Sequence, residues 1–257
     1  MKPFPREADL KAVRHIGIES ELLVTTGEYQ RVTKETQNKI NKRGILQDIG
    51  MDGGGREFRT NPISVKSLSQ VRGAKYLKEY FDMLKEMTNV IETGGTHLHI
   101  SVLDSDHPNM EANATALGMA FFEQFQKISG RETHWADNFG EHLYEDIKTI
   151  EHVAAYIQRN KCGGRRAFYC KGSMIGPTSH QTLEFRGPKG SNDADEILAW
   201  AQFVENVAKV SNRESVHGVE FQELLEGERI SAYVDKLPRS RKIRIKDLRK
   251  KLDTAHL

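Results

Sequence analysis

The sequence has few cysteines, no long apolar run and no apolar leader, and each absence excludes a class of protein. Among its 257 residues only Cys162 and Cys170 are cysteines, so neither a disulfide framework nor a zinc site is expected from two cysteines eight residues apart. Charged residues interrupt every apolar stretch before it reaches the length of a membrane helix. The stretch MKPFPREADLKAVRH at the N-terminus lacks the apolar core of a secretory signal. We therefore expect a soluble, cytoplasmic protein with no membrane partner.

The charges nearly balance over the chain but are unevenly distributed. The net charge is +2, from 38 basic and 36 acidic residues. From Lys236 to the end, nine basic residues stand against two acidic ones, so this segment carries +7 and residues 1–235 carry −5. We expect one domain over 1–235 and a basic C-terminal tail over 236–257. The tail either binds an acidic partner such as nucleic acid or packs as an amphipathic helix, and its apolar positions favour packing.

Three segments alternate apolar and polar residues with the period of a β-strand, at 15–24, 96–102 and 182–186. A shorter strand is expected at 56–60, after a glycine-rich turn. One face of each long segment is apolar, and the other bears acids, imidazoles or a guanidinium. The paired polar side chains are Glu19 with Glu21, His97 with His99 and Glu184 with Arg186, and Glu57 in the shorter strand adds a carboxylate.

Helical periodicity fills much of the sequence between these strands. All-parallel sheets bury both faces and do not alternate in this way, so the pattern predicts an α+β fold with a mainly antiparallel sheet. The helices would cover its apolar face and leave the polar face open. We expect helices at 67–91 with Ser67 and Gln70 as a capping box, at 109–128, at 144–159 and after Asp193 as N-cap, with 161–180 as loop around a short strand at 167–170.

The polar face has the composition of a metal and phosphate site. Carboxylates with an imidazole suit Mg²⁺ or Mn²⁺ better than a structural zinc ion. Arg186, Arg165 and Arg166 supply bidentate donors for phosphate, and phosphoryl transfer depends on such charge neutralisation. The sequence contains no Walker A, nucleophile-elbow, HExxH or dinucleotide motif, so a nucleotide would be held through metal. Clustered carboxylates repel one another, so removing one is expected to leave stability equal or higher.

The order of these motifs resembles the amidoligase family of ATP-dependent carboxylate–amine ligases, which share their catalytic fold with glutamine synthetase and glutamate–cysteine ligase. The resemblance covers about residues 15–210. It implies a curved, mainly antiparallel sheet backed by helices, like the glutamine synthetase catalytic domain, and amide-bond formation through an acyl phosphate. The matching motifs are G-I-E-S-E at 17–21, D-G-G-G-R-E-F-R-T-N-P at 52–62, G-T-H-L-H-I at 95–100 and T-L-E-F-R at 182–186, followed by G-P-K-G-S-N-D-A-D-E-I-L-A-W-A at 187–201.

The resemblance also implies roles for single residues. Arg186 would stabilise the transferred phosphoryl group, with Glu57 as the second catalytic residue, and His99 would contact nucleotide phosphate. Two departures stand out: F-Y-C-K-G at 168–172 replaces the family's Tyr-Tyr-x-x-Asn, and Ser20, expected to face the helices, replaces an aliphatic residue. The implied ligands of Mg²⁺ or Mn²⁺ are Glu19, Glu21, Glu57, His97 and Glu184, and the implied ATP or substrate contacts are Arg131, Arg165 and Arg166.

Two other functions fit the same pattern. A guanidino-type phosphotransferase would use a similar sheet face, and its product would be a phosphorylated guanidine. A metal-dependent protein that binds or modifies nucleic acid would account for the basic tail, and its binding would weaken steeply with salt. The pattern identifies neither the carboxylate nor the amine, which are small molecules or parts of macromolecules, nor the oligomeric state.

Overall fold

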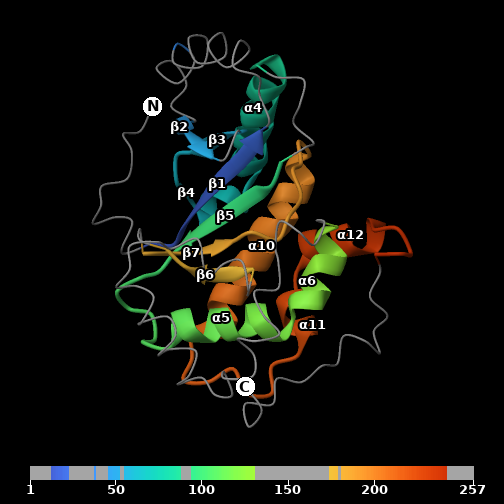
Figure 1. The fold of residues 1–257 in the computed structure, drawn as a ribbon. Coiled ribbons are helices and arrows are strands. Elements are labelled where there is room, and N and C mark those ends of the chain that lie inside the picture. The colour runs from blue at the N-terminus through green and yellow to red at the C-terminus, as the bar shows by residue number, and fades with distance from the viewer. Residues whose placement is uncertain are drawn as a thin grey trace.

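The strands form one antiparallel sheet in the computed structural model, which describes residues 13–22, 38, 46–52, 55–87, 94–130, 174–178 and 181–241 (Figure 1). Within these residues the strand order is β2-β3-β1-β5-β7-β6, and β4 pairs with β1. The predicted mainly antiparallel sheet is thus confirmed. The strands are β1 His15–Leu22, β2 Leu46–Asp52, β3 Gly55–Thr60, β4 Ile63–Ser64, β5 Thr96–Ser101, β6 Ile175–Pro177 and β7 Thr182–Phe185.

Helices back this sheet, which makes the fold α+β (Figure 1). The long helix α10 contacts α4, α5 and β5, and it is therefore the main support of the central strands. None of the described helices is both long and apolar enough to cross a membrane. The helices are α3 Val65–Leu68, α4 Val71–Met87, α5 Met110–Ala120, α6 Phe122–Ser129, α10 Ala194–Ser211, α11 Phe221–Leu224 and α12 Glu228–Lys236.

The core lies between the helices and the apolar face of the sheet. Ile18 on β1, Leu98 on β5 and Phe185 on β7 are buried there, and the Phe185 ring lies 5.5 Å from the Trp200 ring of α10. Because side chains alternate along a strand, burying these residues directs their neighbours Glu19, His97 and Glu184 to the opposite face. The apolar half of each strand thus positions the polar half.

Ser20 points to the helix side of the sheet, as its place in the alternation predicted. Its hydroxyl accepts a hydrogen bond of 2.9 Å from the Tyr80 hydroxyl of α4. The same Tyr80 hydroxyl lies 2.9 Å from the Phe58 carbonyl oxygen on β3. This buried pair of contacts ties α4 to two neighbouring strands, so the polar Ser20 side chain has a hydrogen-bond partner on the helix side of the sheet.

The helix predicted at 67–91 begins earlier and is interrupted. Ser64, rather than Ser67, is the N-cap of α3, since its side chain accepts from the Ser67 backbone N–H. A turn at 69–70 then separates α3 from α4. Gly73 permits this tight turn, because a Cβ there would lie 2.1 Å from the Leu68 carbonyl oxygen. The predicted capping box of Ser67 and Gln70 is wrong because the chain turns where that box would start a helix.

Other boundaries differ in smaller ways. The helix predicted at 109–128 is divided into α5 and α6 at Phe121. Asp193 caps α10 as predicted, by accepting a hydrogen bond of 2.9 Å from the Asp195 backbone N–H. Strands β2 and β6 and helices α11 and α12 were not predicted. The helix expected at 144–159, the strand expected at 167–170 and the tail beyond 241 lie outside the described residues.

Candidate active site

His97 lies at the centre of the polar face. In the ladder between β1 and β5 it is directly opposite Glu19, and its Nδ1 lies 2.9 Å from Glu19 Oε1. The same Nδ1 is 3.3 Å from Glu184 Oε1, and Nε2 is 3.3 Å from Glu21 Oε1. The imidazole is fully buried. One ring from β5 therefore joins carboxylates of β1 and β7.

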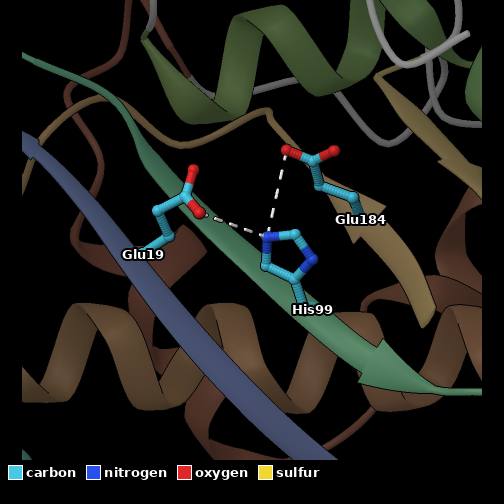
Figure 2. A group of neighbouring side chains, drawn as sticks. All are labelled: Glu19, His99 and Glu184. Atoms are coloured by element: carbon cyan, nitrogen blue, oxygen red, sulfur yellow. Dashed lines mark ion pairs between the residues drawn. The ribbon is translucent and has the colours of Figure 1, made fainter. Parts of the chain in front are cut away.

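His99 contacts the same carboxylates from the other end of the face. It lies opposite Glu184 in the ladder between β5 and β7. Figure 2 shows its ring between Glu19 and Glu184, and His99 Nε2 is 3.8 Å from Glu19 Oε2 and 4.0 Å from Glu184 Oε1. The other ring nitrogen is 3.4 Å from Thr182 Oγ1. Within the described residues, His99 Nε2 is buried without a hydrogen-bond partner.

Two arginines flank this face. Arg186 Nη1 donates to Glu184 at 2.7 Å, and Arg186 Nη2 is 3.4 Å from Glu21 Oε1. Arg186 is held in line with β7 because its backbone N–H donates to the Met174 carbonyl oxygen at 3.0 Å. The predicted pair of Glu184 and Arg186 is thus brought together with Glu21 from β1.

Arg59 on β3 is the flanking residue that the sequence analysis missed. It lies opposite Glu19 in the ladder between β1 and β3, and its Nε donates to Glu19 Oε2 at 2.8 Å. It also forms an ion pair with Glu57 on its own strand. A signal was present, because the tripeptide E-F-R occurs at both 57–59 and 184–186.

The polar face is less open than expected, because its charged groups contact one another. Counted over the whole residue, Glu19, Glu57 and Glu184 are each less than a tenth exposed. Burial would raise the pKa of Glu19, but the hydrogen bond and charge of His97, together with His99 and Arg59, hold it well below the ordinary 4.5. For Glu184, burial is likewise outweighed by the arginine and the two imidazoles, which lower its pKa. Both carboxylates are therefore ionised at neutral pH.

His99 is electrically different from its neighbours. Burial lowers its pKa below the ordinary 6.5, although Glu184 and Glu19 act in the opposite direction. A neutral imidazole is the form that binds a metal ion. A metal-bound histidine also commonly has a hydrogen bond at its second ring nitrogen, which Thr182 supplies here.

The donor atoms fit a hard divalent cation. In the described part of the chain, two groups have ligand atoms that all lie within 4.8 Å of one another. One comprises Glu19, Glu21 and His97, and the other comprises Glu19, His99 and Glu184. Carboxylate oxygens with one imidazole suit Mg²⁺ or Mn²⁺. In the second group, His99 Nε2 is buried without a hydrogen-bond partner among the described residues, so this nitrogen is available as a metal ligand.

Not every predicted site residue falls in these groups. Glu57 belongs to neither of them and contacts Arg59 instead. Arg131, Arg165 and Arg166 lie outside the described residues, as does the F-Y-C-K-G segment at 168–172. The roles assigned to these arginines stay predictions.

Comparison with known proteins gives a weak structural similarity. No family model matches the chain, and no curated protein matches it. Among solved structures, it is similar to a chain in the crystal structure of the complex between Prokaryotic Ubiquitin-like Protein Pup and its Ligase PafA, with 12% identity and a TM-score of 0.38. The match covers 89% of this chain and 59% of that chain, so this chain spans well under two thirds of that protein's length. A likeness of this degree carries no conclusion about family, substrate or partner.

Proposed function

We propose that the protein is an ATP-dependent ligase of the amidoligase family that joins a carboxylate to an amine. The observation that supports this most directly is the meeting of four carboxylates, two imidazoles and Arg186 on one face of four adjacent strands. The motifs whose order resembles the family supply these residues. Neighbouring strands thus bring together residues that are far apart in the sequence, from Glu19 to Arg186, and we propose that they act on one substrate.

The proposed metal ligands are Glu19, Glu21, Glu57, His97 and Glu184. Mg²⁺ or Mn²⁺ held there would offset the charge of the triphosphate and of the transferred phosphoryl group. We also propose that His99 contacts phosphate and shares in metal binding, which its place in the group with Glu19 and Glu184 supports. Binding ATP through ionised carboxylates requires such cations, because the free face would repel a polyanion.

The proposed reaction needs no side-chain nucleophile. A substrate carboxylate oxygen attacks the γ-phosphorus of ATP, forming an acyl phosphate and releasing ADP. The amine then attacks the acyl carbon, phosphate leaves and an amide bond forms. Arg186 is positioned to stabilise the phosphoryl oxygens, with Arg131, Arg165 and Arg166 proposed as further contacts to nucleotide or substrate. Both substrates are small molecules or groups on macromolecules.

The test is ATP turnover with Mg²⁺ in the presence of amino acids and polyamines, with mass spectrometry of the products. We expect an amide together with ADP and phosphate. Glu184→Gln should abolish turnover, whereas Glu205→Gln should not, since Glu205 pairs with Lys209 on α10. A phosphorylated guanidine in place of an amide would contradict the proposal.

A further inference from the structure

Arg59 contacts two of the proposed metal ligands, Glu19 and Glu57, where a metal ion would also bind. Its Nε donates to Glu19 Oε2 at 2.8 Å, and its Nη2 pairs with Glu57. The same Glu19 oxygen lies 3.8 Å from His99 Nε2, in the second group of potential metal ligands. A metal ion bound by Glu19 through Oε2 would therefore share that oxygen with the guanidinium.

Arg59, Glu19 and Glu57 differ in the exposed fraction of their side chains. The Arg59 side chain is 38% exposed, while those of Glu19 and Glu57 are 9% and 11% exposed. A long side chain that is already partly exposed can move its guanidinium from a carboxylate to water without burying it elsewhere. Displacing Arg59 is thus less costly than displacing either acid.

The charge of the face indicates how many cations it accepts. Glu19, Glu21, Glu57 and Glu184 supply four negative charges, and each contacts one of the two arginines. The sum is −2 before any charge on the imidazoles, which one divalent cation offsets. Further cations would have to enter with the negative charge of a nucleotide.

We propose that Arg59 is a built-in counter-ion: it holds Glu19 and Glu57 in place in the metal-free protein and gives up Glu19 Oε2 when a divalent cation binds. Arg59 therefore sets the affinity of the face for metal. It is a positioning residue, since it acts through the two carboxylates. The inference rests on the proposed function in taking this face as the metal site.

The test is a titration of the nucleotide-free protein with Mn²⁺, with free Mn²⁺ followed by electron paramagnetic resonance. Arg59→Gln should bind Mn²⁺ about tenfold more tightly than the unaltered protein, because one positive charge next to the ion is removed. Arg59→Lys keeps the charge but loses the fork that spans two carboxylates, so it should bind about threefold more tightly. Arg14→Gln is the matched control, since Arg14 pairs with Asp106 at 2.6 Å and with none of the proposed ligands, and it should leave affinity unchanged.

Each outcome separates this inference from the proposed function. Unchanged or weaker Mn²⁺ binding in both Arg59 variants, with ATP turnover intact in the unaltered protein, would overturn the counter-ion role alone. Absence of Mn²⁺ binding in the unaltered protein and in all variants would overturn both. If Arg59→Gln does not fold, Arg59→Lys decides: affinity at or below that of the unaltered protein contradicts the inference.

Discussion

Both carboxylate oxygens of Glu19 contact other side chains of the face. Oε1 contacts His97 Nδ1 at 2.9 Å, and Oε2 accepts from Arg59 Nε at 2.8 Å. The acid pattern alone indicated mutual repulsion, so that losing one carboxylate would not destabilise the fold. The pairing of the acids with arginines and imidazoles favours the opposite expectation.

Glu19→Gln should lower the free energy of unfolding by about 2 kcal/mol at pH 7, since buried partners lose a charged acceptor. The folded-state pKa of Glu19 lies below 4.5, so its stabilisation is present above about pH 4.5 and is lost as the pH falls further. The variant should therefore show a shallower acid decline than the unaltered protein. Urea unfolding in EDTA measures both effects, with Glu205→Gln as control at less than about 0.5 kcal/mol. An equally steep acid decline in the variant would contradict the assignment.

The two histidines of β5, His97 and His99, differ in their burial and in their contacts. His97 is fully buried and contacts three carboxylates. Burial lowers the pKa of His99, and its Nε2 is buried without a hydrogen-bond partner among the described residues. His97 thus supports the fold as well as being a proposed metal ligand, whereas His99 has a ring nitrogen available to a ligand.

His97→Asn should therefore cost stability as well as metal binding, whereas His99→Asn should cost mainly metal binding. We expect the first to lower the free energy of unfolding by about 3 kcal/mol, because it leaves a cavity and unpaired buried carboxylates. The second should change stability by less than about 1 kcal/mol and weaken Mn²⁺ binding about tenfold. Melting curves in EDTA and Mn²⁺ titration report the two effects. Equal stability losses in both variants would show that the two rings are equivalent.

At the scale of elements, the sequence predicted the strands that have one apolar and one polar face. β1, β5 and β7 alternate clearly, so their faces and most site residues followed from the period of two. β2 and β6 were missed because the tripeptide of β6 is too short for a pattern, and β2 lay at the edge of a region with little periodicity. Arg59 was missed because only Glu57 was considered in its strand. The start of α3 at Val65, with Ser64 as its N-cap, was missed because the prediction treated α3 and α4 as one helix that starts at Ser67.

Gly17 in β1 and Gly94, shortly before β5, should respond differently to substitution by alanine. A Cβ at Gly94 would lie 1.6 Å from the Glu21 carbonyl oxygen, whereas one at Gly17 would have its nearest contact at 3.9 Å, with His99 Cβ. Gly94→Ala should lower the free energy of unfolding by about 3 kcal/mol or more, since backbone must move. Gly17→Ala should change it by less than about 1 kcal/mol, as the matched control. Calorimetric melting decides, and a tolerated Gly94→Ala would contradict this close approach.

At the scale of the whole molecule, the first residues of the basic tail already contact the body. Leu237 is 7% exposed. A Cβ at Gly130, which follows α6, would lie 2.1 Å from Arg241 Cζ, so the guanidinium rests against that backbone. Together with the apolar residues in the sequence of the tail, these contacts favour the prediction that the tail packs against the rest of the protein.

Deletion of residues 242–257 tests the tail without removing Leu237 or Arg241. If the tail packs, the melting temperature should fall by about 3 °C, and turnover of small and macromolecular substrates should fall alike. Differential scanning calorimetry and turnover at two salt concentrations measure this. An unchanged melting temperature with a salt-dependent loss confined to an acidic macromolecule would show instead that the tail is a docking segment.

The pairing of Glu19 with His97 across β1 and β5 has a consequence for how reliably the chain folds. A slip of either strand by one residue would turn its acids or imidazoles toward Phe58 and Leu98 and expose its apolar residues to water. Burying unpaired charge in that core would be far more costly than any contact the slipped sheet could gain. The polar residues of this face thus also specify the strand register during folding, because a misaligned sheet would be strongly destabilised. A molecule that has reached its folded state has therefore also assembled its site.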